Sequence, residues 1–272
     1  MNVLGVISFS LFFGTMLSRL GPQGAQMIAL VNAFNEVIMR MVLAILWLAP
    51  FGISCLIAAQ MAASPDLPRV LRALGMYVFC VVLSLLIHGG LILPGIYFAV
   101  TKKNPIPFVK GVTQALATAF GTDSSSATLP VSMLCCERNN GISPVVTKFV
   151  LPLAATVNMN GTALYEALTV LFIAQLHGVH LGVGQTIVVA LTSTLAAVGA
   201  AAIPSAGLVT MVMVLQSAGM DAYVADLSII FTIDWFLDRV RTTVNVLGDC
   251  FGAGIVQHLC GHELAGGTAD RE

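Results

Sequence analysis

A run of ionisable and amide side chains lies inside an apolar part of the chain, at residues 234–249 (DWFLDRVRTTVNVLGD). Ionisable groups at the centre of a bilayer cost at least about 2.5 kcal/mol each, so they face a protein interior, a water path or one another. At about 100° per residue, six polar side chains of this run share a helical sector roughly 100° wide: Asp234, Asp238, Arg241, Thr242, Asn245 and Asp249. The spacing predicts a helix whose polar stripe binds an anion through Arg241 and a cation through Asn245 and Asp249.

An alternative for this run is a helix on the membrane surface whose charges lie in water. The flanking segments argue against it, because Leu227–Phe236 and Cys250–Leu259 are almost entirely apolar. Charges between two apolar segments fall within a span rather than beyond it.

The composition excludes an ordinary soluble protein, because 57% of the 272 residues are hydrophobic and only 9% are charged. We therefore expect an all-α membrane protein with roughly five spanning helices. The apolar runs close to spanning length are Val3–Leu17, Met41–Ala63, Val78–Val100, Phe149–Leu176, Thr186–Leu215 and Ala225–Leu259. The net charge of −1 gives no reason to expect a nucleic-acid partner.

The cysteines and histidines show no metal-ligand spacing, and no nucleophile–base pair accompanies the aspartates of residues 234–249. We therefore expect no cofactor. An enzyme is a weak alternative for this chain.

Two apolar stretches are interrupted by small and polar residues, at Ala115–Pro130 (ALATAFGTDSSSATLP) and Val198–Gly207 (VGAAAIPSAG). Non-helical backbone at membrane depth occurs only where it lines a cavity or packs on protein. A pair of broken segments in corresponding halves of a chain is typical of transporters that bind their substrate near the midplane. Taken singly, the first can equally be a serine-rich aqueous loop and the second an ordinary kink; together they favour two re-entrant helical hairpins.

The predicted helix between these hairpins carries VNMNGTALYEA at residues 157–167. Asn158, Thr162 and Glu166 are spaced i, i+4, i+8 and are expected to share one face. Gly161 weakens the helix locally and frees carbonyl oxygens for a cation. Glu166 is the only acid between Lys148 and Asp221. Two roles remain open for it: a carrier of a proton in a low dielectric, or a fixed structural partner of a nearby arginine.

Four segments occur in order, TDSSSATLP (122–130), NMNGTALYEA (158–167), AAIPSAGLVTM (201–211) and DWFLDRVRTTVNVLGD (234–249). Together they resemble the excitatory amino acid transporters of solute carrier family 1, the dicarboxylate/amino acid:cation symporters. The similarity covers essentially the whole chain. It implies a partial glutamate-transporter-like fold, in which spanning helices accompany the two hairpins, and a homotrimer in the cell membrane that works by an elevator movement. The implied parts are scaffold helices at residues 1–65, a mobile transport domain at 66–262 and a polar tail at 263–272.

The resemblance also implies a site for L-glutamate or L-aspartate between the hairpin tips. Arg241 would pair with the side-chain carboxylate, and Asp238 and Thr242 would take the amino group. Asn245 and the backbone of Ser125 and of the segment from Ile203 to Gly207 would bind the α-carboxylate. The implied substrate-binding residues are Ser124, Ser125, Ser126, Thr162, Ile203, Gly207, Asp238, Arg241, Thr242 and Asn245.

Sodium ions would be the coupling ions, at two sites. One sodium site would be formed by Ala154, Asn158, Asn245 and Asp249, and the other, under the outer tip, by Thr156, Met159, Ala197, Val198 and Ala200. Glu166 matches the acid that couples transport to H⁺ and K⁺, and the family also conducts Cl⁻. Neutral amino acid exchangers of the family lack an arginine at the position of Arg241 and have glutamine at that of Glu166, so both residues here indicate acidic substrates.

The chain departs from the family pattern in four respects. It begins at what resembles the end of the fourth transmembrane segment. Asn160 stands where the family has aspartate, which removes a charge from a third sodium site. Asp123 stands where relatives have serine or alanine, and we expect it to pair with Arg239. Ala202 replaces a glycine in the outer tip and is expected to stiffen it.

These departures leave two further functions open besides transport. One is a substrate-gated chloride channel, in which weakened ion coupling leaves the anion conductance dominant. The other is a truncated subunit that does not transport but assembles with full-length subunits.

Overall fold

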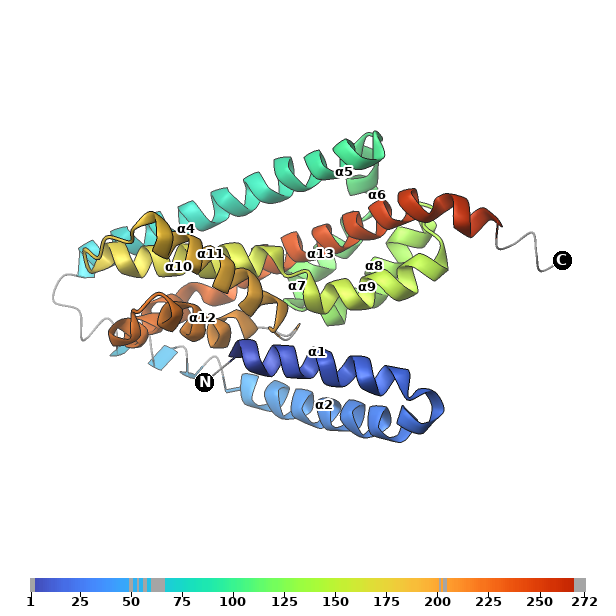
Figure 1. Ribbon diagram of the computed structural model, residues 1–272. Coiled ribbons are helices and arrows are strands. Elements are labelled where there is room, and N and C mark those ends of the chain that lie inside the picture. The colour runs from blue at the N-terminus through green and yellow to red at the C-terminus, as the bar shows by residue number, and fades with distance from the viewer. Residues whose placement is uncertain are drawn as a thin grey trace. The chain divides into compact units, whose positions relative to one another are not determined.

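The computed structural model describes residues 3–48, 51–52, 54–55, 58–59, 67–200, 202 and 205–266. Over these residues the chain is almost wholly helical and contains no strand (Figure 1). The predicted all-α class is therefore confirmed. The chain divides into two compact units, Met1–Leu67 and Pro68–Glu272. Their correspondence to a scaffold and a transport domain stays a prediction.

The first unit contains a helical hairpin. Helix α1 (Val3–Arg19) is joined by the short 3-10 helix η1 (Gly21–Gly24) to α2 (Ala25–Leu46). Gly21 has a φ of +58°, which glycine adopts without strain. Large apolar side chains of this hairpin are exposed, for example Phe9 at 67% and Phe34 at 66%. Such a surface needs lipid or protein to cover it.

The second unit begins with one long helical rod, made of α4 (Leu67–Ile87), the π-helical turn η2 (His88–Ile92) and α5 (Leu93–Thr101). Within the described residues, Leu71–Thr101 is the one helix long and apolar enough to cross a membrane by length and composition. The other long apolar runs are divided. Phe149–Leu176 is interrupted at Asn158, and Thr186–Leu215 is interrupted after Val198. These two predicted runs are therefore not continuous helices, and the second interruption is the one that the sequence predicts at Val198–Gly207.

The remaining elements form the two predicted hairpins and the helices that flank them. In chain order they are α6 (Pro105–Gly111), α7 (Thr113–Thr122), α8 (Ser125–Arg138), α9 (Pro144–Val157), α10 (Asn160–Leu176), α11 (Val183–Val198), α12 (Ala206–Ser217), the 3-10 helix η3 (Asp221–Asp226) and α13 (Leu227–Gly266). The inner hairpin is α7–α8 and the outer hairpin is α11–α12, and each pair of helices is in contact.

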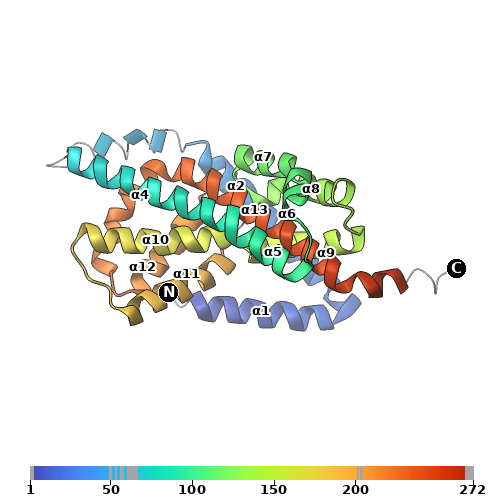
Figure 2. The same ribbon diagram turned by 90° about the horizontal axis from the view of Figure 1, so that it is seen from above.

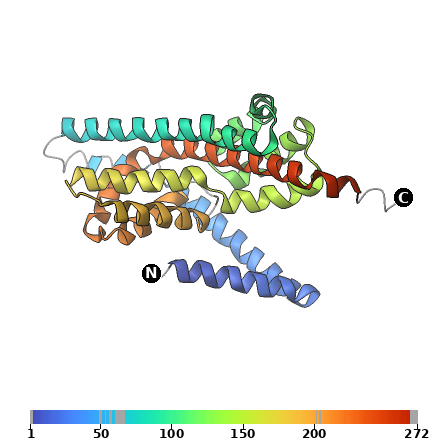
Figure 3. The same cartoon turned by 45° about the horizontal axis from the view of Figure 1, so that its top comes forward.

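Helix α13 is the central element of this unit. It contacts α5, α7, α8, α9 and α10. Figures 2 and 3 show α7–α9 along its C-terminal half and α10–α12 beside its N-terminal half. Two apolar clusters follow the same division, one containing Tyr165, Met211 and Leu237, the other Phe108, Cys250 and Phe251. The polar stripe of α13 therefore lies where the two hairpins meet.

The crossing of α10 over α13 depends on a glycine. A Cβ added to Gly161 would lie 2.8 Å from the backbone oxygen of Arg241 and 3.1 Å from Asn245 Oδ1. The backbone oxygen is fixed by its own helix, so it has little room to give way. The close approach of the two helices brings the polar residues of α13 to the start of α10.

We expect Gly161→Ala to lower the free energy of unfolding by about 1–3 kcal/mol, because the added methyl group overpacks this crossing. The measurement is thermal unfolding of the purified protein in detergent, followed by tryptophan fluorescence. Gly252→Ala is the matched control, because a Cβ there meets nothing within 4 Å. Equal unfolding temperatures for the two variants would contradict this account of the crossing.

Candidate functional site

The tip of the inner hairpin is a two-residue reversal. Helix α7 ends at Thr122, and Asp123 follows in the left-handed region with φ 59°. Aspartate tolerates that conformation better than most residues. Ser124 is extended and caps α8, because its Oγ accepts a hydrogen bond from the backbone N–H of Ala127 at 3.2 Å. The reversal is thus formed by Asp123 and Ser124, and the other two serines predicted to bind substrate, Ser125 and Ser126, are the first residues of α8.

The tip of the outer hairpin lies against the inner one. Helix α11 ends at Val198 and α12 begins at Ala206, after Ser205 in the left-handed region with φ 58°. The hydroxyl of Ser124 donates to the carbonyl oxygen of Ala202 at 2.8 Å. The two hairpins therefore meet tip to tip. Ile203, predicted to bind substrate, lies outside the described residues.

The polar stripe of α13 is buried. Each of its six members is 1–5% exposed: Asp234, Asp238, Arg241, Thr242, Asn245 and Asp249. The stripe faces the protein interior, as the helical spacing predicts, and the alternative of a surface helix with hydrated charges is wrong.

Arg241 is held by two carboxylates and an aromatic ring. Its Nη2 donates to Asp238, and its Nη1 lies 3.9 Å from Oδ1 of Asp234. The guanidinium carbon lies 4.6 Å from the ring centroid of Tyr165. The Tyr165 hydroxyl in turn donates to Asp234 at 2.8 Å. These contacts compensate the buried positive charge and orient the guanidinium plane.

One part of this guanidinium remains available to a ligand, because Nη1 is buried and has no hydrogen-bond partner. The outer hairpin comes very close at this point. A Cβ on Gly207 would lie only 2.6 Å from that nitrogen. A glycine at the start of α12 is therefore needed to bring the outer hairpin over the arginine.

A small cavity lies between the hairpin tips and α13. Its volume is about 20 Å³, enough for a single water molecule but not for an amino acid. The residues that line it are Asp123, Ser125, Met159, Thr162, Ala202, Ala206, Gly207, Asp238, Arg241, Thr242 and Asn245. The cavity is therefore too small to hold an amino acid while the two tips are in contact.

The structure brings seven of the ten predicted substrate-binding residues to this cavity: Ser125, Thr162, Gly207, Asp238, Arg241, Thr242 and Asn245. Ser124 lies beside it in the contact between the tips. Ser126 is exposed, and it is not among the described residues that line the cavity. Ala206 lies within the predicted segment from Ile203 to Gly207, whereas Asp123 and Ala202 line the cavity without having been predicted to bind substrate.

The expected ion pair between Asp123 and Arg239 does not form. Arg239 Nη1 instead donates to the carbonyl oxygens of Phe120 and Gly121, each at 3.0 Å. These carbonyls belong to the last turn of α7, where a cation is favoured by the helix dipole and by unpaired acceptors. Asp123 keeps a buried oxygen, Oδ1, that has no partner.

The helix predicted over residues 157–167 is broken. Helix α9 ends at Val157, and Asn158 and Met159 have non-helical ψ angles of 63° and 59° before α10 starts at Asn160. Asn158 is therefore not on the face that carries Thr162 and Glu166. The physical reason is that the asparagine side chains compete with the helical hydrogen bonds and favour helix ends. The break leaves backbone carbonyl groups available where the sequence predicts a cation.

The residues of the first predicted sodium site lie around this break. The Asn158 amide donates to Asp249 Oδ1 at 3.0 Å, and Oδ1 of Asn245 accepts from the Gly161 N–H at 2.7 Å. Ala154 and Asn158 line a cavity of about 240 Å³ beside Gly248. Carboxylate, amide and carbonyl oxygens are the ligand types that hard cations prefer. The donor set fits a sodium ion.

Only some of the residues of the second predicted sodium site lie close together. Met159, Ala197 and Ala200 form a small buried cluster with Ala202 under the outer tip, and Val198 lies next to it, half-buried. Thr156 is exposed, and its hydroxyl donates to its own helix, to Leu153 O at 2.9 Å.

Glu166 is fully buried on α10 and accepts a hydrogen bond from the hydroxyl of Thr210 on α12. Its second oxygen is buried without a partner. Among the described residues it forms no ion pair with an arginine. The hydrogen bond from Thr210 therefore links Glu166 to the outer hairpin.

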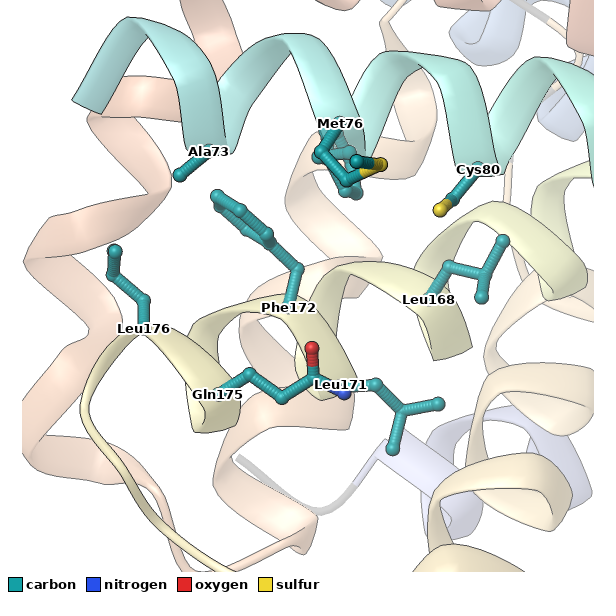
Figure 4. A pocket seen from close by; sticks show the side chains of 9 residues that line it. Ala73, Met76, Cys80, Leu168, Leu171, Phe172, Gln175 and Leu176 are labelled. Atoms are coloured by element: carbon teal, nitrogen blue, oxygen red, sulfur yellow. The ribbon is translucent and has the colours of Figure 1, made fainter. Parts of the chain in front are cut away.

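A larger cavity, of about 370 Å³, lies between α4 and α10. Figure 4 shows Met76, Phe172 and Leu176 around it, with the Gln175 amide as a polar group. No Lys, Arg, Asp or Glu is among its described lining residues, so it does not suit a charged amino acid.

Comparison of the sequence with known proteins places this chain in a family. The Sodium:dicarboxylate symporter family model matches residues 1–259. Excitatory amino acid transporter 2 of Homo sapiens is 53% identical over 264 residues, which are 97% of this chain and 46% of that protein. Excitatory amino acid transporter 1 of Ambystoma tigrinum is 51% identical over 269 residues, 99% of this chain and 49% of that protein.

The chain spans about half the length of the curated relatives it matches. Both relatives are transporters by name, and their family is one of membrane-bound symporters, not of enzymes. The family resemblance that the four sequence segments suggested is confirmed, and the chain belongs to the sodium:dicarboxylate symporter family.

Proposed function

We propose that this chain carries the substrate and sodium sites of a sodium-coupled symporter for L-glutamate and L-aspartate. The observation that carries the proposal is Arg241, a buried guanidinium with a free donor in a closed cavity between two hairpin tips. Because the chain spans about half of its relatives, the activity of the whole protein is part of the proposal.

Substrate binding follows from the donors and acceptors around the cavity. A side-chain carboxylate of the substrate replaces Asp238 on Arg241 and gains two parallel charged hydrogen bonds. Thr242 and Asn245 offer a hydroxyl and an amide to the α-carboxylate and amino group. Ser125 is the first residue of α8, so the N-terminus of that helix faces the substrate anion.

Sodium coupling follows from the break between α9 and α10. A cation among Asn158, Asn245 and Asp249 would neutralise a buried carboxylate next to the substrate residues. Asn245 connects the two sites, because its Oδ1 accepts from the backbone at the break while its Nδ2 donates to Thr162 at 3.2 Å. Binding of the ion and binding of the substrate are then coupled through the same side chain.

We also propose how the hairpins gate the site, how the chain moves, which further ions take part and how the chains assemble. The hairpin tips would open and close as gates, and the 68–272 unit would move as an elevator against the scaffold. Glu166, linked to the outer hairpin through Thr210, would couple transport to H⁺ and K⁺. A homotrimer in the cell membrane, with an accompanying Cl⁻ conductance, completes the proposal.

Arg241→Lys should reduce the efficiency of sodium-dependent uptake of radiolabelled L-aspartate by at least about 100-fold, because an ammonium group does not reproduce the paired guanidinium donors. Arg138→Lys, an exposed site on α8, is the control and should leave uptake unchanged. Normal uptake by the Arg241 variant would contradict the proposed site. Aspartate-gated anion current without any uptake would instead favour the channel alternative.

Asp249→Asn should raise the sodium concentration needed for half-maximal uptake by about tenfold or more, because the site loses its formal negative charge. Asp221→Asn removes an exposed acid outside this region and serves as the matched control. The readout is L-aspartate uptake against sodium concentration in proteoliposomes. An unchanged sodium dependence would show that Asp249 does not ligate the coupling ion.

Glu166→Gln should abolish the stimulation of net uptake by internal potassium while it preserves sodium-dependent exchange of L-aspartate. The amide keeps an acceptor for the Thr210 hydroxyl but neither gains nor loses a proton. Net uptake and exchange are measured in the same vesicles. Persistent potassium stimulation in the variant would exclude Glu166 as the coupling acid.

A further inference from the structure

A polar cavity of about 420 Å³ lies where α5, α6 and the loop between α8 and α9 meet the C-terminal part of α13. Its volume falls within the range of about 300–1,000 Å³ that is typical of small-molecule sites. It shares no described lining residue with the cavity between the hairpin tips. The side chains that line it include Tyr97, Lys103, Phe108, Asn140, Gln257 and His258.

The walls of this cavity are fixed by the packing of the protein itself. The rings of Tyr97, Phe108 and Phe251 form one cluster, with centroids 5.0–5.2 Å apart. A Cβ on Gly254 would lie 2.8 Å from the Phe108 ring, so this glycine lets α13 come close to α6. The Asn140 amide donates to the Phe108 carbonyl oxygen at 3.2 Å, which holds the α8–α9 loop against α6. A ligand therefore meets a preformed cavity, which lowers the cost of binding.

The lining of this cavity favours an anion. Lys103 and His258 are basic, and no acid is among the described lining residues. The three sequence segments that form the cavity also contain no Asp or Glu, at residues 93–112, 139–144 and 250–261. A bound anion is therefore not repelled by a carboxylate of these segments.

Three side chains bring hydrogen-bond donors to the cavity. Lys103 supplies an ammonium group, and His258 supplies a ring N–H in either protonation state. The Gln257 side-chain oxygen accepts from the backbone N–H of Ser143 at 2.8 Å, which leaves its amide NH₂ group as a donor. Lys103 follows α5, whereas the other two donors lie on α13. A ligand with several acceptor oxygens can therefore bind donors from both elements at once.

We propose that this cavity binds a phosphomonoester, the group carried both by phosphorylated inositol lipids and by soluble inositol phosphates. Such a group carries a charge of about −1.5 to −2 and three strong acceptor oxygens, which match the basic lining and its three donors. The site is separate from the one proposed for the amino acid, and the inference does not depend on transport activity.

The position of the cavity along the chain supports this ligand. Lys102 and Lys103 directly follow the long apolar rod that ends at Thr101, and Lys110 lies on α6 just beyond them. By the positive-inside rule, lysines next to the end of a span indicate the cytoplasmic side. Basic pockets between membrane helices on that side bind phosphoinositide headgroups.

The test compares two probes, a short-chain phosphatidylinositol bisphosphate and its soluble headgroup, inositol trisphosphate. Short-chain phosphatidylcholine, which has no phosphomonoester, is the lipid control. Dissociation constants are measured with the purified chain in detergent by titration calorimetry, at an ionic strength of about 0.15 M, where exposed charges are screened beyond about 8 Å. Tighter binding of the inositol lipid than of its headgroup identifies the membrane as the source of the phosphate. Equal or weaker binding of the lipid identifies a soluble ligand.

Lys103→Gln is expected to weaken binding of the inositol probe at least about tenfold, because one charge-assisted hydrogen bond is lost. His258→Ala is the second variant and should weaken binding in the same direction. Lys102→Gln is the matched control, because it removes the same charge from the neighbouring residue, which is exposed and is not among the described lining residues. It should leave binding nearly unchanged. Lys103 is also exposed, so its substitution should not alter the unfolding temperature of the ligand-free chain.

Equal weakening by the two lysine variants would show diffuse attraction to a basic segment rather than a site, and would overturn the proposal. Phosphatidylcholine that binds as tightly as the inositol lipid would overturn it as well. The same conclusion would follow if the unmodified chain bound neither inositol probe.

Discussion

The burial of Arg241 among apolar helices is the constraint on which the rest of this structure depends. A lone guanidinium in such a place is not tolerated, so the fold surrounds it with Asp234, Asp238 and the face of Tyr165. The same contacts require α10 and α13 to cross closely, which Gly161 allows. They also require the outer hairpin to lie directly over the arginine, which Gly207 allows. The contacts that hold Arg241 in the candidate site are therefore also the contacts that pack α10, α13 and the outer hairpin together.

The helix ends bring unpaired backbone groups to the candidate site. Each hairpin tip and the break at Asn158 leaves backbone N–H or C=O groups without helical partners. In a membrane protein such groups are tolerated only where they meet protein, ions or a lined cavity. Here all three interruptions are brought to the middle of α13, where its charged side chains lie. Backbone and side-chain groups therefore contribute to the same sites.

Much of this arrangement was predictable from the sequence, because it rests on local patterns. The helical period places the stripe from Asp234 to Asp249 on one face, and the serine-rich and Gly/Pro-rich interruptions indicate the hairpins. What was missed depends on neighbours distant in the chain. Arg239 was assigned to Asp123 because both are charged, whereas the structure gives it the carbonyl groups at the end of α7. The helix break at Asn158 was anticipated only in part: Gly161 was expected to weaken the helix, but Asn158 was still placed on one helical face with Thr162 and Glu166.

The central claim is that Arg241 makes this cavity selective for a second carboxylate on the amino acid. The most direct measurement compares binding of L-aspartate and L-asparagine to the purified chain in sodium, because the two differ only in whether that group is charged. The account predicts that L-aspartate binds at least about 100-fold more tightly, the scale expected for a lost bidentate charged pair. Equal affinities for the two amino acids would contradict it.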